Sequence, residues 1–347
     1  MMRAAVIEGP GRIAIRDADV PAPGPGQVLV EVAWCGICGT DLHGALEGWM
    51  PPGTVGGHEW SGTVVAAGQG ASQWSEGDLV VGGPPWCGAC QWCRAGRPAL
   101  CVADPVRSTG SGHGGGEFGG AFAEYLLAGA DTLRSVPPGL DLRAAALSEP
   151  LAVAMHGISA AKLPDDLSGL RFLVSGGGPL GQLVAAALRA AGAEDVTVSE
   201  PSAVRRAQAL AAGATSAVGP QDLPAPPAVP TEAHQDGFHC VIETSGAATA
   251  VTTALALLRP AGTLVLLGTG AFEIRLDAMR VLLNELVVTG AYCYDAGGID
   301  SALALLASGR LPVEALLPPA DVGLDDLLDT MNRLHAGEIP TKALVRP

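Results

Sequence analysis

The sequence predicts a two-domain α/β protein, in which a mostly β domain is followed by a parallel, doubly wound α/β domain. Three observations predict this fold class. The 347 residues exceed what one compact core usually serves. Up to about residue 145, glycine and proline interrupt short β-rich runs every 8 to 12 residues. After Pro150, β-type runs alternate with Ala- and Leu-rich helical stretches.

The first domain, residues 1–152, is expected to be irregular and mostly β. Runs such as 28–32 and 62–65 are rich in valine and bounded by turn residues, which is typical of short strands.

The second domain, residues 153–292, is expected to alternate strand and helix, which implies crossover units and a parallel sheet. A Pro-rich segment, 221–235, is expected to be an exposed loop. From about residue 293, two more helical stretches and a strand at 342–345 follow, and these could belong to either domain. The expected strands are 172–174, 196–198, 240–242, 264–267 and 286–288, and the helices lie near 180–191, 202–212, 248–258 and 277–284.

A glycine-rich turn follows the first of these strands and fits the pattern G-x-G-x-x-G. Glycines permit a tight turn and close approach of the backbone to a pyrophosphate, and the N-terminus of the next helix offers free N–H groups to it. The residues expected to bind a dinucleotide here are Gly176, Gly178, Pro179, Leu180 and Gly181.

An acidic residue, Glu200, ends the next expected strand, 19 residues after Gly181. A carboxylate there would accept hydrogen bonds from the adenosine ribose hydroxyls and repel a 2′-phosphate, so NAD is favoured over NADP. Arg205 and Arg206 keep NADP open, because a guanidinium near this pocket could hold the phosphate; they could equally lie solvated on the next helix.

Four cysteines occur within fifteen residues, at Cys87, Cys90, Cys93 and Cys101. They are close enough to wrap one tetrahedral zinc, and four ligands leave no open position, so this metal would be structural. An iron–sulfur cluster and a zinc ribbon that binds nucleic acid are weaker alternatives. Arg94 and Arg97 are the basic neighbours of this loop.

A second set of metal-binding residue types comprises Cys38, His58, Glu59 and Glu149. Sulfur, nitrogen and oxygen donors with fewer than four permanent ligands suit a catalytic zinc, which keeps a position for water or a substrate oxygen. Each residue alone could be structural. His58 could be an ordinary partly buried histidine, and Glu149 before Pro150 could begin or end a helix.

The runs 36–43, 56–59 and 148–152 resemble the zinc-containing medium-chain dehydrogenase/reductase superfamily, and Glu149-Pro150-Leu151 is similar to its polyol and threonine dehydrogenase branch. The resemblance covers nearly the whole chain. It implies a GroES-like catalytic domain, formed by residues 1–152 with 293–347 returning to it, and a Rossmann NAD-binding domain at 153–292.

The resemblance also implies roles for individual residues. Hydride would pass between NAD and a secondary alcohol or polyol, or the matching ketone, with two zinc ions per chain. An isomerase or lyase that uses tightly bound NAD transiently, and a non-catalytic relative, are the alternatives. Cys38 and His58 would ligate the catalytic zinc. Glu59 would be a permanent or an exchangeable ligand, and Glu149 would ligate the zinc directly or act through water. Thr40 and His43 would pass on the alcohol proton, and Asp41 would orient His58.

Three large side chains near these runs have no assigned role. Trp60 follows Glu59, where relatives more usually have an aliphatic or Phe side chain. Trp49, Met50 and Trp60 could line a bulky substrate cleft or belong to the core, and the Gly-rich stretch 108–120 also leaves the pocket undefined.

Composition narrows the partners and the compartment. A net charge of −15 disfavours a nucleic-acid surface, which needs clustered Lys and Arg. The start of the chain has no secretory pattern, and Arg259 and Pro260 break the most apolar stretch, so we expect a cytoplasmic protein without a membrane span. A homodimer or homotetramer is expected, with 286–292 as a candidate edge strand. The remaining cysteines, Cys35, Cys240 and Cys293, are expected to be small buried thiols.

Overall fold

The chain folds into two compact units in a computed structural model that describes residues 1–83, 86–103, 119–225, 227, 229, 232–270, 273, 274 and 276–347. The first unit comprises residues 1–150, 295–309 and 317–347, and the second comprises 151–294 and 310–316. The chain thus leaves the first unit near residue 150 and returns to it near 295. The segment 310–316 packs with the second unit, a separation that the sequence-based division does not make.

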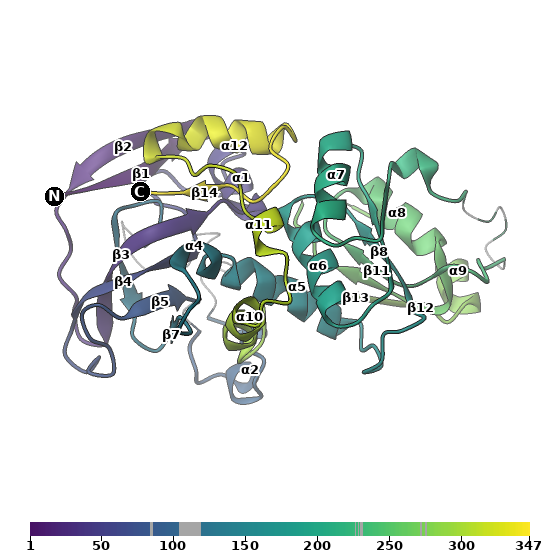
Figure 1. The fold of residues 1–347 in the computed structure, drawn as a ribbon, viewed down its shortest axis with the longest axis horizontal. Coiled ribbons are helices and arrows are strands. Elements are labelled where there is room, and N and C mark those ends of the chain that lie inside the picture. The colour runs from purple at the N-terminus through teal and green to yellow at the C-terminus, as the bar shows by residue number, and fades with distance from the viewer. Residues whose placement is uncertain are drawn as a thin grey trace. The chain divides into compact units, whose positions relative to one another are not determined.

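The first unit is built on antiparallel strands, in agreement with the predicted β character (Figure 1). β1 (Met2–Gly9) pairs with β2 (Arg12–Ala18) in a two-stranded sheet. A larger sheet has the order β14-β3-β4-β5-β7, with β6 also paired to β3. The bounds of its strands are β3 Gln27–Gly36, β4 Glu59–Ala67, β5 Leu79–Gly82, β6 Tyr125–Gly129, β7 Leu133–Ser135 and β14 Leu344–Val345.

The last strand of the chain lies beside the start of the candidate site. In the antiparallel pair of β14 and β3, Leu344 is opposite Gly36 and Val345 is opposite Cys35. Residues near the C-terminus therefore reach the segment that leads into Cys38.

The helices of this unit are α1 Gly39–Leu46, α2 Gln91–Arg94, α4 Leu142–Ala145, α10 Gly298–Ala307 and α12 Leu327–His335, with 3₁₀ turns η1 Pro98–Leu100 and η3 Leu324–Asp326. One further helix, α5 Ser148–Ala160, crosses the boundary between the units.

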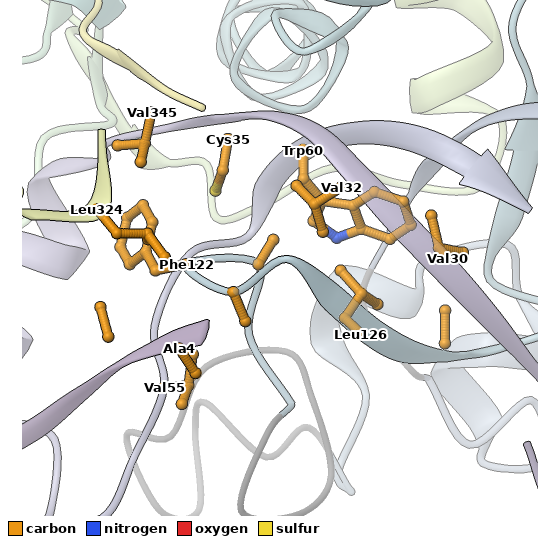
Figure 2. Packing of buried hydrophobic residues seen from close by; sticks show 14 of the residues in the cluster. Ala4, Val30, Val32, Cys35, Val55, Trp60, Phe122, Leu126, Leu324 and Val345 are labelled. Carbon is orange, nitrogen blue, oxygen red and sulfur yellow. The ribbon is translucent and has the colours of Figure 1, made fainter. Parts of the chain in front are cut away.

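The core of the first unit settles the roles of the three large side chains. Trp60 is buried and lies with Val32 and Leu126 (Figure 2). Its indole fits because the neighbouring residue is Gly82, where a Cβ would collide with the ring. Met50 is also in the core, whereas Trp49 is 42% exposed. Most of the Gly-rich stretch 108–120 lies outside the described residues.

The second unit contains one parallel sheet of six strands in the order β10-β9-β8-β11-β12-β13. Numbered within this unit, the order is 3-2-1-4-5-6, that of a doubly wound dinucleotide-binding sheet, and it reverses between β8 and β11. Because parallel crossovers are right-handed, this reversal places the helices of the two halves on opposite faces. The strands are β8 Arg171–Ser175, β9 Asp195–Ser199, β10 Ser216–Val218, β11 Phe238–Glu243, β12 Leu258–Leu266 and β13 Val287–Gly290.

The predicted strands and helices of this unit are confirmed, and β10 is an additional short strand that the sequence did not predict. The Pro-rich segment begins with the 3₁₀ turn η2 (Pro220–Asp222), and its residues 226, 228, 230 and 231 lie outside the described residues. The helices are α6 Pro179–Ala190, α7 Ala203–Ala211, α8 Ala248–Ala256, α9 Ala278–Leu283 and α11 Val313–Leu316.

Candidate active site

A buried aspartate joins the two segments that carry the candidate ligands Cys38 and His58. Cys38 is the N-cap of α1, and its N–H donates to Asp41 Oδ2 at 2.9 Å. The Gly57 N–H donates to Asp41 Oδ1 at 3.1 Å, directly before His58. Asp41 Oδ1 also lies 3.7 Å from His58 Nδ1, which is longer than a direct hydrogen bond. Asp41 therefore fixes the backbone on both sides of the site.

Three candidate ligands converge in the first unit. One ligand atom each from Cys38, His58 and Glu59 lie within 4.8 Å of one another. A thiol, an imidazole and a carboxylate in this arrangement fit a zinc ion that keeps a position open for another ligand. The sequence separates Cys38 from the other two, and the antiparallel pairing of β3 with β4, which places Gly36 opposite Glu59, brings them together.

The fourth predicted residue, Glu149, lies in the first turn of α5 and is buried. It is not in the group of three ligand atoms found among the described residues. Burial raises its pKa to about 7, although the charges of His58 and Lys342 oppose this shift. Glu149 therefore lies within electrostatic reach of the site and can be protonated or charged near neutral pH.

A buried lysine that sequence reasoning missed neutralises Glu59. Lys342 Nζ lies 2.7 Å from Glu59 Oε1 and 2.6 Å from Oε2, with side-chain exposures of only 6% and 1%. Lys342 also donates to the Ile37 carbonyl at 3.1 Å. Gly36 makes room for the carboxylate, because a Cβ there would collide with Glu59 Oε2. The one signal in the sequence is a lysine two residues before the apolar strand β14.

The charges of the site act on one another. Burial lowers the pKa of His58, but the charges of Asp41 and Cys38 outweigh burial and raise it well above its usual value. Burial likewise lowers the pKa of Lys342, and the charges of Glu59 and Cys38 raise it overall. The acidic groups therefore give this site a negative potential, which favours a proton on His58 or a metal ion bound in its place.

The predicted proton-relay residues lie on α1. Thr40 Oγ1 is 3.8 Å from Cys38 Sγ, so the hydroxyl is next to a candidate metal ligand. His43 Nδ1 lies 3.0 Å from Glu47 Oε1. The His43 imidazole stacks on Trp49, with ring centroids 4.4 Å apart and an angle of 15° between the planes. The exposed Trp49 indole thus covers one face of the imidazole.

The four cysteines of the second cluster also converge. One sulfur atom each from Cys87, Cys90, Cys93 and Cys101 lie within 4.8 Å of one another. Backbone N–H groups point at the sulfurs: that of Cys90 donates to Cys87 Sγ at 3.3 Å, and that of Cys87 to Cys101 Sγ at 3.5 Å. Backbone hydrogen bonds lower the pKa of Cys90 to about 6. Desolvation and the neighbouring thiols raise the pKa of Cys93 to about 12. The convergence of the four sulfurs fits a closed metal site.

The glycine-rich turn connects β8 to α6. Gly176 has φ +109°, which favours glycine, and Gly178 is the N-cap of α6. Pro179 and Leu180 are the first two helical residues, and Pro suits this position because its missing N–H is not needed there. A Cβ on Gly181 would collide with the Gly176 carbonyl, so only glycine fits. The helix N-terminus is thus open to an anion.

Glu200 lies against this turn. Its Oε2 accepts the Gly177 N–H at 2.8 Å, and its Oε1 accepts the Ser202 N–H at 2.9 Å. Each carboxylate oxygen can accept a second hydrogen bond, so ribose hydroxyls could still bind. Arg206 donates to the Glu200 carbonyl at 2.8 Å, which holds its guanidinium on the backbone. Arg205 lies in the first turn of α7, where its N–H is 3.5 Å from Ser202 Oγ.

A doubly wound sheet with a glycine-rich turn, together with a Cys–His–Glu donor set, is the combination that a metal-dependent dehydrogenase requires. Residues 24–138 match the family model of the alcohol dehydrogenase GroES-like domain, and residues 179–308 match that of the zinc-binding dehydrogenases. The chain belongs to the zinc-dependent medium-chain dehydrogenase/reductase superfamily and is an oxidoreductase of the alcohol dehydrogenase type, as the sequence predicts.

Individual relatives extend over nearly the whole chain. The 2-dehydro-3-deoxy-L-galactonate 5-dehydrogenase of Pseudoalteromonas atlantica is 35% identical over 311 residues, which cover 87% of each chain. The 2R,3R-butanediol dehydrogenase of Bacillus subtilis superposes with a TM-score of 0.86 at 29% identity, covering 100% of both chains. A Sinorhizobium meliloti protein described as a zinc-binding dehydrogenase, with NADP bound, superposes at 0.84 and 32% identity, covering 100% and 99%.

Among the helices of the described residues, none has the length and hydropathy that a membrane span requires.

Proposed function

We propose that this protein transfers hydride between NAD and a secondary alcohol or polyol, or the matching ketone, with a zinc ion held by Cys38, His58 and Glu59. The observation that carries the proposal is the convergence of these three side chains within 4.8 Å. A zinc ion bound there would act as a Lewis acid toward the substrate oxygen. The first unit would be the catalytic domain and the second the NAD-binding domain.

The side chains around the zinc ligands have separate tasks in this proposal. Asp41 holds the backbone of both ligand segments, because its carboxylate accepts hydrogen bonds from the N–H groups of Cys38 and Gly57. Thr40, next to Cys38, takes up the alcohol proton while its own hydroxyl proton is passed on, and His43 on the same helix exchanges that proton with water. Glu149 is buried within electrostatic reach of His58 and Lys342 but lies outside the group of three ligand atoms. We assign Glu149 to a water-mediated place beside the metal.

Metal content tests the two zinc sites separately. We expect about two zinc ions per chain, because one donor set is open and the other is closed. Cys38→Ala should remove activity and leave about one zinc, because the four-cysteine site is intact. Cys93→Ala should first lower solubility or stability. A wild-type content of one zinc per chain would contradict the two-site proposal.

Cofactor choice is tested at Glu200. The carboxylate beside the glycine-rich turn supports NAD, and the NADP bound to the S. meliloti relative makes NADP the competing outcome. Glu200→Ala should weaken NAD binding and narrow the preference over NADP. Glu194, an exposed residue directly before β9, offers a matched control: Glu194→Ala should leave the preference unchanged. Equal affinity of the wild type for both cofactors would contradict the assignment.

A screen of NAD reduction over sugar acids, polyols, diols, amino alcohols and terpenoid alcohols tests the substrate class. The relatives are named for a sugar acid and a diol, which supports substrates with several polar groups. Release of free NADH during steady turnover would exclude an isomerase or lyase with transient oxidation. No NAD or NADP reduction with any of these alcohols, in protein with full zinc content, would overturn the proposal.

A homo-oligomer is part of the proposal. β13 ends the parallel sheet, and apolar side chains beside it are exposed, among them Met279, Leu282 and Val287. A second copy of the chain could continue the sheet there and cover these side chains. Sedimentation should show a dimer or tetramer, and Val287→Lys should dissociate it. A monomeric wild type would contradict this. A reducing compartment such as the cytoplasm suits the thiolate ligands.

A further inference from the structure

The loop that follows β11 lies where the strand order of the parallel sheet reverses. β11 ends at Glu243, and its neighbour β8 ends at Ser175, directly before the glycine-rich turn. Ligands of doubly wound sheets bind at the carboxyl ends of the strands at such a reversal. The residues from Glu243 to Gly246 therefore lie beside the turn that would receive the cofactor diphosphate.

Thr244 is bonded to this turn in three ways. Its N–H donates to the Ser175 carbonyl at 2.8 Å. Its hydroxyl lies 3.1 Å from both the Ser175 and the Gly176 carbonyl oxygens and donates to this pair. The hydroxyl also fills the space beside two motif glycines, because a Cβ on Gly176 or Gly181 would lie 2.8 or 3.0 Å from it. The conformation of the turn therefore depends on Thr244.

Glu243, directly before Thr244, fixes the two residues that follow Thr244. Its side chain is fully buried and accepts the Ser245 N–H at 2.7 Å, the Ser245 hydroxyl, and the Gly246 N–H at 3.1 Å. Its carbonyl accepts the N–H groups of Leu267 at 2.9 Å and Gly268 at 2.8 Å. These bonds join the ends of β11 and β12 and leave the loop little freedom. A rigid support of this kind lowers the ordering cost of binding a ligand.

We propose that Thr244, held by Glu243, is a positioning residue that sets the glycine-rich turn for the cofactor diphosphate and thereby determines cofactor affinity. The inference rests on the proposed dinucleotide function. Thr244 acts through the backbone of Ser175 and Gly176 and takes no part in proton or hydride transfer. Its loss should therefore change cofactor binding and leave the chemical step intact.

Thr244→Val and Thr244→Ser test the hydroxyl at nearly constant shape. NADH binding is measured by nicotinamide fluorescence, and KM and kcat with NAD and a screened alcohol. Thr244→Val should weaken NADH binding about threefold to tenfold, the worth of one buried hydrogen bond, and raise KM for NAD to a similar extent. kcat and the KM for the alcohol should stay unchanged. Thr244→Ser keeps the hydroxyl and should bind within about twofold of wild type.

The outcomes separate this inference from the proposed function. A wild type that binds neither NADH nor NADPH overturns both. A wild type that binds NADH, with Thr244→Val binding equally well or Thr244→Ser failing to rescue, overturns the positioning role alone. Glu243→Gln adds a second test. If Glu243 acts through Thr244, the losses of NADH affinity in the single variants should not add in the double variant, and full additivity contradicts the coupling.

Discussion

Replacing Lys342 with methionine tests the buried ion pair of the candidate zinc site. Methionine keeps most of the side-chain volume and removes the charge, so the Glu59 carboxylate stays buried without its cation. Both side chains are almost fully buried, and the Nζ to Oε distances are 2.6 and 2.7 Å. Breaking such a pair costs about 3–5 kcal/mol of unfolding free energy. At roughly 2–4 °C per kcal/mol, the first unit should melt about 6–20 °C lower.

The assay can be confined to the unit that carries the pair. All six tryptophans lie between residues 34 and 92, within the first unit, so tryptophan fluorescence follows its unfolding alone. Unfolding in urea is compared for zinc-free wild type, Lys342→Met and the double variant Lys342→Met/Glu59→Gln. The double variant buries no unpaired charge and should recover most of the loss. A single variant within about 1 kcal/mol of wild type, or a double variant as unstable as the single, would refute the reasoning.

Three further predictions follow from the packing and from a buried thiol. Gly181→Ala should abolish NADH binding and lower the melting temperature. Gly178→Ala, whose Cβ would meet nothing within 4 Å, should weaken NADH binding at unchanged stability. Equal stability of both variants would contradict this prediction. Gly82→Ala should destabilise the first unit by about 1–3 kcal/mol in tryptophan-monitored unfolding, and adding Trp60→Phe should restore part of the loss; no recovery would show that the indole is not the obstacle. Burial raises the pKa of Cys240 from 9.0 to about 12. The folded state thus keeps the thiol proton to a higher pH than the unfolded state does. The free energy of unfolding should therefore fall by about 1.4 kcal/mol per pH unit as the pH rises between these two values. Circular dichroism should show a shallower alkaline loss for Cys240→Val, and identical slopes would contradict the assignment.

The parts of the fold and site that could be predicted are those written in short stretches of sequence. The four-cysteine loop spans fifteen residues, and the turn Gly176–Gly181 follows one strand and opens one helix. In both, spacing along the chain largely fixes spacing in space. The alternation of β-type and helical runs likewise predicts the parallel sheet, because the hydrophobic pattern within each run indicates whether it forms a strand or a helix. β10 was missed because three residues carry too little pattern.

Contacts between residues that are far apart in the sequence could not be predicted in the same way. Trp60 looks equally like a pocket residue or a core residue until Gly82, on the neighbouring strand, is seen to receive its ring. Glu200 is correctly placed at the end of a strand, but only the structure shows that its oxygens accept N–H groups of Gly177 and Ser202. Such contacts depend on side-chain direction and on strand register, which no local pattern records.

The sequence by itself determined the class of fold, the donor types at both candidate metal sites and the position of the glycine-rich turn, because these depend on residues close together in the chain. Only the tertiary structure decided what surrounds them. Lys342 reaches Glu59 across 283 residues because β14 pairs with β3, and Thr244 reaches Gly176 because β11 lies beside β8. Strand pairing is set by burial of the whole sheet. The partners of a motif residue are therefore a property of the folded chain.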